Sequence, residues 1–182
     1  MKGNRAAAAA VIGIVLVLGA WWLFRGGTGA TAIALVDHLA TATKAPAGAS
    51  FEVIDAELNG ETRRAITATP PTRLTFKVQV PDDGWLNVAV GLKPEAWTLE
   101  GDGVLFFVGV FDQRTFEMLF TQHVNPFGNP GDRKWIPIWV DLSAYAGEEV
   151  DLIFNTRVSQ PGKPEDPRND LALWGAPEIV VR

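Results

Sequence analysis

Few side chains in this sequence could carry out catalysis. Its 182 residues include no cysteine, three serines and two histidines, His38 and His123. His123, Asp141 and Ser143 are the residue types of a nucleophilic triad, but no pattern around them supplies an oxyanion hole. Asp141 and Ser143 also stand two positions apart on or beside one strand, where a turn motif already accounts for both.

The acidic pairs do not indicate an active site either. Glu148 and Glu149, like Glu165 and Asp166, lie in predicted turns and loops, where a solvated charge is the ordinary state. Glycoside hydrolysis needs two carboxylates held across a cleft. The sequence also lacks zinc-protease, phosphate-binding and nucleophile-elbow motifs. We therefore predict that the protein is not an enzyme.

The distribution of charge argues against nucleic-acid binding. The formal net charge is −5, and three of the 16 basic residues, Lys2, Arg5 and Arg25, precede the first acidic residue, Asp37. Residues 26–182 therefore carry 13 basic and 21 acidic side chains. Such an acidic domain lacks the basic face on which phosphate contacts depend.

From Ser50 onward the sequence alternates between apolar and polar residues, with turn residues every 8–12 positions. This pattern predicts an all-β domain over residues 50–182, and the number of short strands favours a two-sheet jelly-roll sandwich. The strand candidates span residues 51–58, 62–68, 73–80, 85–92, 104–111, 115–124, 135–142, 150–158 and a last stretch around 172–174 and 178–181.

Two of these strands, residues 104–111 and 135–140, are apolar on both faces, although a sandwich strand normally has one solvated face. The cover of the second face could be a loop of the same chain (125–134 or 159–170), a protein partner, the membrane surface, or a sugar stacked on indole rings. We place the partner-or-sugar face on Trp135 and Trp139, with Phe127 from the neighbouring loop.

The N-terminal segment, residues 1–25, predicts a membrane anchor. Residues 6–24 are uncharged and long enough to span a bilayer as a helix, with Trp21, Trp22 and Arg25 at the interface. Lys2 and Arg5 place the N-terminus in the cytoplasm and the β domain in the periplasm or outside the cell. The alternative is a cleaved signal peptide ending near residue 32 or 34, although the apolar run is long for one.

Residues 26–49 are predicted to be a linker. A glycine-rich joint at 26–29 precedes a stretch, residues 31–43, whose apolar residues have the spacing of a short helix lying on the membrane or on a partner. His38 falls in this stretch, as a solvated or interface side chain or else as a pH sensor or a pigment or metal ligand.

The segment Trp139–Thr156 resembles a strand–turn–strand signature of bacterial galactose-binding-like jelly rolls, which include carbohydrate-binding modules. The residues that carry the resemblance are Asp141, Ser143, Tyr145, Gly147 and Trp174. Read physically, Ser143 caps a one-turn helix, Tyr145 buries its ring and donates its hydroxyl to a backbone group, and Gly147 supplies a positive φ. The resemblance implies the fold and leaves the function open.

The family resemblance also implies a structural calcium ion in some members. Asp82, Asp83, Asp166 and Asp170 could supply oxygen ligands, but none of them forms a calcium-loop spacing. We therefore predict no cofactor and no catalytic metal, with structural calcium as the open alternative.

Two hypotheses about function remain. In the first, the protein is a non-catalytic, single-span accessory subunit whose β-sandwich braces a larger integral-membrane complex, such as a respiratory or photosynthetic one. In the second, it is a membrane-tethered carbohydrate-binding module. The stacking platforms would then be found among five tryptophans, Trp85, Trp97, Trp135, Trp139 and Trp174. A Trp beside Asp, Asn or Arg in one concavity would favour the module, and a flat apolar patch would favour the subunit.

Overall fold

A computed structural model of the chain describes residues 31–158, 162 and 164–182. In these residues the regular elements are strands and single-turn 3₁₀ helices. In chain order they are β1 (Thr31–Ala34), η1 (Leu35–His38), β2 (Thr43–Ala45), β3 (Val53–Leu58), β4 (Glu61–Thr67), β5 (Thr72–Gln79), β6 (Gly84–Leu92), η2 (Pro94–Ala96), β7 (Val104–Phe111), β8 (Phe116–Val124), η3 (Pro130–Asp132), β9 (Ile136–Asp141), η4 (Ser143–Tyr145), β10 (Glu149–Arg157) and β11 (Ala172–Val181).

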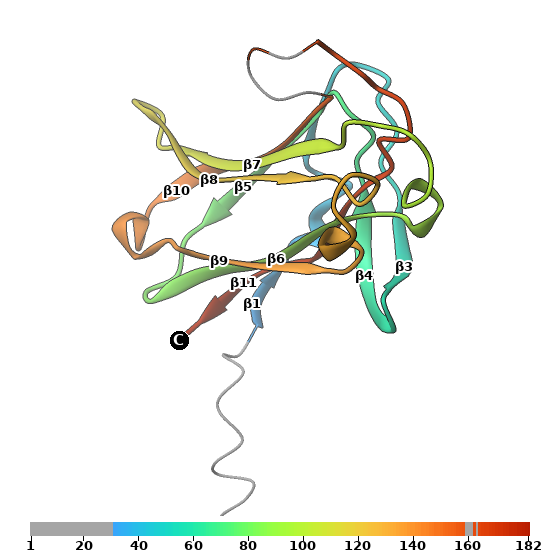
Figure 1. Cartoon of the computed structure of the whole chain (residues 1–182). Helices are drawn as coiled ribbons and strands as arrows, with labels where there is room; N and C mark the ends of the chain where they lie inside the picture. Colours follow the sequence, from blue (N-terminus) through green and yellow to red (C-terminus); the bar gives the residue numbers. More distant parts are fainter. Residues whose placement is uncertain (1–30, 159–161, 163) are drawn as a thin grey trace, which may run out of the picture. The chain divides into compact units, whose positions relative to one another are not determined.

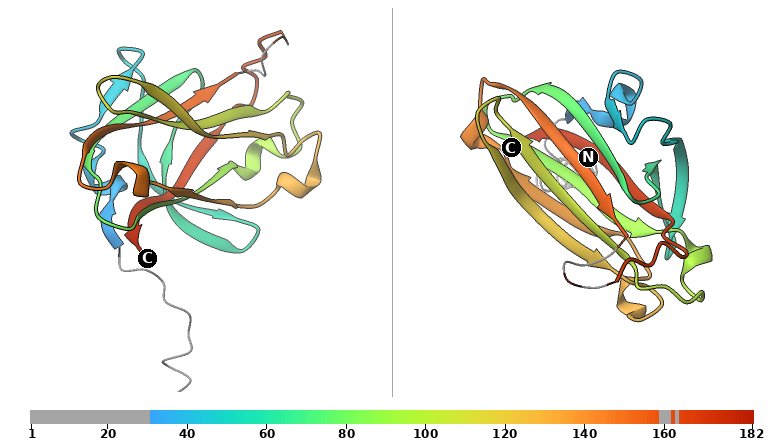
Figure 2. Two further views of the ribbon diagram at one scale, coloured as in Figure 1. Left: turned by 90° about the vertical axis from the view of Figure 1, so that its left-hand side faces the viewer. Right: turned by 90° about the horizontal axis from the view of Figure 1, so that it is seen from above.

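The strands form two stacked antiparallel sheets (Figures 1 and 2). Sheet A has the order β3-β4-β11-β6-β9, with β1 also paired to β11, and sheet B has the order β2-β5-β10-β7-β8. Most neighbours in these orders are far apart in the chain, which is the arrangement of a jelly roll. The predicted all-β, two-sheet sandwich is therefore confirmed.

The core lies between the two sheets and follows the predicted alternation. On β5 the inward residues Leu74, Phe76 and Val78 are buried, while Arg73 and Lys77 point outward. Aromatic rings fill the centre, where Trp174 meets Phe106 and Phe154 edge to face, with ring centroids 5.0 and 4.9 Å apart. A two-residue turn at Asn59 and Gly60, both with positive φ, joins β3 to β4, as the Asn-Gly pair predicts.

The predicted linker is the main correction to the fold. Residues 31–45 belong to the sandwich, because β1 pairs with β11 in sheet A and β2 pairs with β5 in sheet B. The residues at helical spacing are Ile33, Val36, Leu39 and Ala40, with Leu35 beside them. Of these, Leu35, Val36 and Leu39 pack into the core of the sandwich as parts of η1 and the residue after it. The compact unit therefore begins at Thr31, not at Ser50.

The chain itself covers the second face of strand 104–111, where Leu105 and Phe107 are buried, but on strand 135–140 it covers Trp135 and leaves Pro137 and Trp139 exposed. Trp135 lies across Gly175 of sheet A, with its ring Cζ3 2.6 Å from where a Cβ of Gly175 would stand. Its indole N–H donates to the carbonyl of Glu61, the first residue of β4. On sheet B, the guanidinium of Arg157 lies 4.9 Å from the ring centroid of Phe107. The cover thus includes the β3–β4 hairpin and side chains of neighbouring strands.

No helix within the described residues is long and apolar enough to cross a membrane. The predicted anchor, residues 6–24 with Trp21, Trp22 and Arg25, lies outside the described residues.

Candidate functional site

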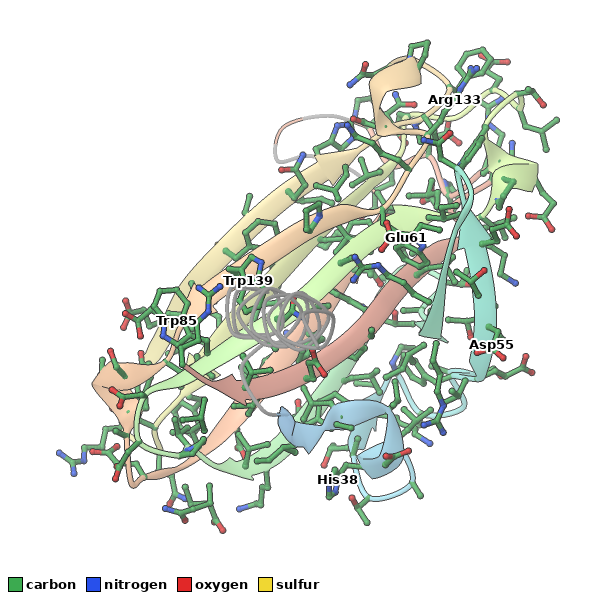
Figure 3. The ribbon with its side chains drawn as sticks, turned by 90° about the horizontal axis from the view of Figure 1, so that it is seen from below. His38, Asp55, Glu61, Trp85, Arg133 and Trp139 are labelled. Atoms are coloured by element: carbon green, nitrogen blue, oxygen red, sulfur yellow. The ribbon has the colours of Figure 1, made fainter. Side chains whose placement is uncertain are left out.

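Two tryptophans stand together on the outer face of sheet A, at the end where β11 finishes. Trp85 is the second residue of β6 and Trp139 lies on the edge strand β9, and both point away from the core because Leu86 and Val140 point into it (Figure 3). The Trp139 side chain is 43% exposed. Part of the Trp139 indole is therefore exposed at the surface.

The guanidinium of Arg182 joins the two rings. Its Cζ lies 4.1 Å from the centroid of Trp139 and 5.3 Å from that of Trp85. The backbone N–H of Arg182 donates to the Asp83 carbonyl at 3.2 Å, which fixes this end of the chain against the β5–β6 turn. A stacked guanidinium keeps its N–H donors at the edge of the rings, where they can reach a ligand.

Polar side chains lie beside the rings in the same row of the sheet. Asn87 of β6 is directly opposite Trp139 on one side and Glu178 of β11 on the other. The Asn87 amide donates to Glu178 Oε1 at 2.9 Å. We call the five residues Trp85, Asn87, Trp139, Glu178 and Arg182 the tryptophan face.

The tryptophan face combines aromatic surface with hydrogen-bond donors and acceptors beside it. A sugar presents the same combination, because one side of its ring is a patch of C–H groups and its rim carries hydroxyls. The described residues at this face include no nucleophile–base pair.

The structure separates the three residues predicted for a partner-or-sugar face. Trp135 is only 4% exposed and belongs to a small core cluster beneath the β3–β4 hairpin. Phe127 is exposed, but it lies in the loop after β8, beside Leu92 and Asn169 at the opposite end of β6 from Trp85. Of the three, Trp139 alone lies on the tryptophan face.

The residues of the turn motif have structural positions. Ser143 is the first residue of η4 and does not cap it; its backbone N–H donates to the Asp141 carboxylate at 2.9 Å, and this hydrogen bond holds the pKa of Asp141 below its usual value. Gly147 has a φ of +75°. The Tyr145 hydroxyl donates to the Glu117 carboxylate at 2.7 Å, not to a backbone group. Burial, together with this carboxylate, raises the pKa of Tyr145 to about 12.

The four aspartates considered for calcium are not all brought together, because Asp166 lies close enough to Asp170 for its charge to raise the pKa of Asp170, whereas Asp82 and Asp83 lie in the β5–β6 turn. Asp83 is next to Arg182, at the end of β11, whereas Asp170 precedes the start of the same strand. Asp166 forms an ion pair with Arg168, at 2.7 Å. In the described chain no group of three or more acidic, His or Cys side chains is placed to hold a metal ion.

The histidines do not contribute to a catalytic site in the described structure. The ring of His123 bonds through Nε2 to the Asp102 carbonyl at 2.8 Å, so it is not arranged as a triad with Asp141 and Ser143. His38 is exposed at the end of η1.

Comparison with known proteins supports the fold. No protein-family model matches the chain. An uncharacterized protein of Archaeoglobus fulgidus is 40% identical over 104 residues, which is 57% of this chain and 25% of that protein. The chain thus spans about a quarter of the length of this curated relative.

Solved structures similar to this one include carbohydrate-binding modules. A structure of the CBM51-2 and INT domains of Clostridium perfringens ZmpB, in complex with GlcNAc, has a TM-score of 0.56 at 15% identity, over 76% of this chain and 29% of that one. The module TmCBM61, in complex with β-1,4-galactotriose, has a TM-score of 0.51 at 9% identity, over 82% of this chain and 94% of that one. At these identities the likeness shows the fold alone.

The sequence placed Trp85 and Trp139 among the candidates but missed the polar part of the tryptophan face. The alternation along 85–92 could have placed Asn87 on the outer side with Trp85. Glu178 and Arg182 gave no such signal, because they reach the site only through the pairing of β11 with β6.

Proposed function

We propose that the domain binds carbohydrate through the tryptophan face. The observation that carries the proposal is the exposed indole of Trp139 beside the amide of Asn87 and the guanidinium of Arg182, on a fold that known carbohydrate-binding modules share. The accessory-subunit hypothesis draws no support from the comparisons or from the described residues.

In the proposed complex the C–H side of a sugar ring packs on Trp139, and the hydroxyls at its rim bond to Asn87, Glu178 and Arg182. The hydrogen bond between Asn87 and Glu178 fixes both side chains before the ligand arrives, which lowers the entropic cost of binding. The carboxylate of Glu178 can accept hydrogen bonds from hydroxyl groups, and the guanidinium of Arg182 can donate hydrogen bonds to hydroxyl oxygens.

Binding should be tested by calorimetric titration with GlcNAc, methyl-galactoside and β-1,4-galactotriose. We expect Trp139→Ala to weaken binding of whichever sugar binds by at least about tenfold, about 1.4 kcal/mol, because the stacking surface is lost. Phe127→Ala is the matched control, since it removes another exposed aromatic ring at the opposite end of β6. Equal affinities for the wild type and Trp139→Ala would place the sugar elsewhere, and no binding of a wider glycan panel would refute the function.

We also propose that residues 6–24 anchor the domain in the cell membrane, with the N-terminus in the cytoplasm and the domain in the periplasm or outside the cell. The support is the length of the uncharged run and the basic residues before it. The protein should stay in the membrane pellet after alkaline extraction, and protease should digest the domain once the outer envelope is opened. A mature protein that begins near residue 33 or 35 would contradict the anchor.

A further inference from the structure

A groove of about 330 Å³ lies on the outer face of sheet B, away from the tryptophan face of sheet A. Its lining comes from four adjacent strands, β5, β10, β7 and β8. The lining residues are Arg73, Ile153, Arg157, Phe107, Phe111, Phe116 and Met118. We call this the arginine groove.

One side of the arginine groove is apolar and accessible. The side chains of Phe116 and Met118, on the edge strand β8, are 50% and 53% exposed. The ring of Phe116 lies directly over Gly109 of β7, where a Cβ would collide with it. Ile153 continues the apolar surface toward β5, because it pairs with Gly109 on one side and with Thr75 on the other.

The other side of the groove is positively charged. Arg73 and Arg157 are exposed and stand on the neighbouring strands β5 and β10. Within the described residues neither guanidinium forms an ion pair with a carboxylate, although the chain as a whole is acidic, with a net charge of −5. Arg157 is stacked on the Phe107 ring, which orients its donors without using them.

We propose that the arginine groove binds a small apolar carboxylate, an acyl or aryl acid. Its carboxylate would bond to Arg73 and Arg157, since guanidinium groups match carboxylates in charge and in fork geometry. Its hydrocarbon body would pack against Phe107, Ile153 and Met118. The volume lies at the lower end of the range for small-molecule sites, which favours a compact molecule over a peptide or an oligosaccharide.

The probe for a first test is 4-phenylbutanoate, titrated into the full chain by calorimetry, with 4-phenylbutanamide and glucuronate as comparisons. The amide keeps the apolar body and loses the charge, and glucuronate keeps the charge and loses the apolar body. We expect the acid to bind at least about tenfold more tightly than either comparison, because the groove supplies both kinds of contact.

The variants should separate the two sides of the groove. The double variant Arg73→Gln/Arg157→Gln should weaken binding of 4-phenylbutanoate at least about tenfold and remove most of its salt dependence. Met118→Ser should weaken it several-fold with the salt dependence intact. Lys77→Gln is the control, because Lys77 is exposed on β5 outside the groove lining. A melting curve of each variant shows whether it is folded, and the two single arginine variants replace the double variant if that one unfolds.

Several outcomes would overturn the proposal. Equal affinity for the amide would show that the arginines do not recognise the carboxylate. Equal or tighter binding of glucuronate would make the groove a site for acidic sugars, and preferred binding of a short peptide that ends in Phe would make it a peptide site. No binding of the acid up to about 10 mM would also refute it. None of these results bears on the tryptophan face, which lies on the other sheet and is tested with neutral sugars.

Discussion

Replacing Trp174 with alanine should lower the free energy of unfolding by about 3–5 kcal/mol, out of the ~5–15 kcal/mol that stabilises a typical domain. The ring is buried at the centre of the sandwich, between Phe106 of β7 and Phe154 of β10. Its removal leaves a cavity between the two sheets. The sheets can close this cavity only by shifting relative to each other, which the close packing of the core opposes.

The matched control is Trp139→Ala, which removes the same side chain from the exposed outer face of β9. It should cost about 1 kcal/mol or less, because the indole is only partly withdrawn from water. Urea denaturation of the wild type and both variants measures the difference as a shift in midpoint at constant slope. Equal shifts would mean that the inner and outer faces of sheet A have been assigned wrongly.

The stability of the domain should fall as the pH rises from about 4 to about 7, because of one buried carboxyl group. The Asp170 residue is 2% exposed, and neither carboxylate oxygen has a hydrogen-bond partner among the described residues. Burial, and then the negative charges of Asp102 and Asp166, raise the pKa of Asp170 from 3.8 to about 7. The folded state therefore holds a proton that the unfolded state releases near pH 4, and this advantage of the folded state is lost as the pH approaches 7.

A shift of this size corresponds to a loss of up to about 4 kcal/mol between the two pH values. Asp170→Asn removes the titrating proton, so the variant should show a much flatter profile and exceed the wild type in stability at pH 8. Asp112, Asp141 and Asp166 have lowered pKa values, so their contribution to stability rises with pH. That contribution changes only below about pH 4, where an ordinary aspartate titrates. Chemical denaturation of both proteins at pH 4.5, 6 and 8 measures the free energy of unfolding at each pH. If it falls with pH as steeply in Asp170→Asn as in the wild type, Asp170 is not the source of the pH dependence.

The sandwich was predictable because most of its strands bury one face only. In a strand such as β5, apolar residues at every second position mark the buried face, and the Asn-Gly pair marks the β3–β4 turn. The prediction of a linker was wrong for residues 31–45 because an apolar pattern shows only that a face is covered. The spacing of Val36 and Leu39 reveals that something covers them, but it does not distinguish a membrane from the core of the domain.

The binding face was harder to predict, because burial along one strand depends on what packs over it. Trp135 and Trp139 have the same phase in the sequence, yet the β3–β4 hairpin covers one and leaves the other exposed. Asn87 and Glu178 are bonded although they are 91 positions apart. Pairings over such distances are decided by the fold as a whole, and a local pattern does not reveal them.

The pairing of β1 with β11 sets Thr31 opposite Val180, so the chain enters and leaves the sandwich at adjacent points (Figure 1). A domain with this geometry can be spliced into a surface loop of a host protein without pulling its own ends apart. It can also be permuted, with a short peptide joining Arg182 to Thr31 and new ends opened between Asn59 and Gly60. Such a permutant would retain the strand pairings and would be attached to its host at the tip of the β3–β4 hairpin. The domain that carries the tryptophan face could then be joined to a host either at β1 and β11 or at this hairpin.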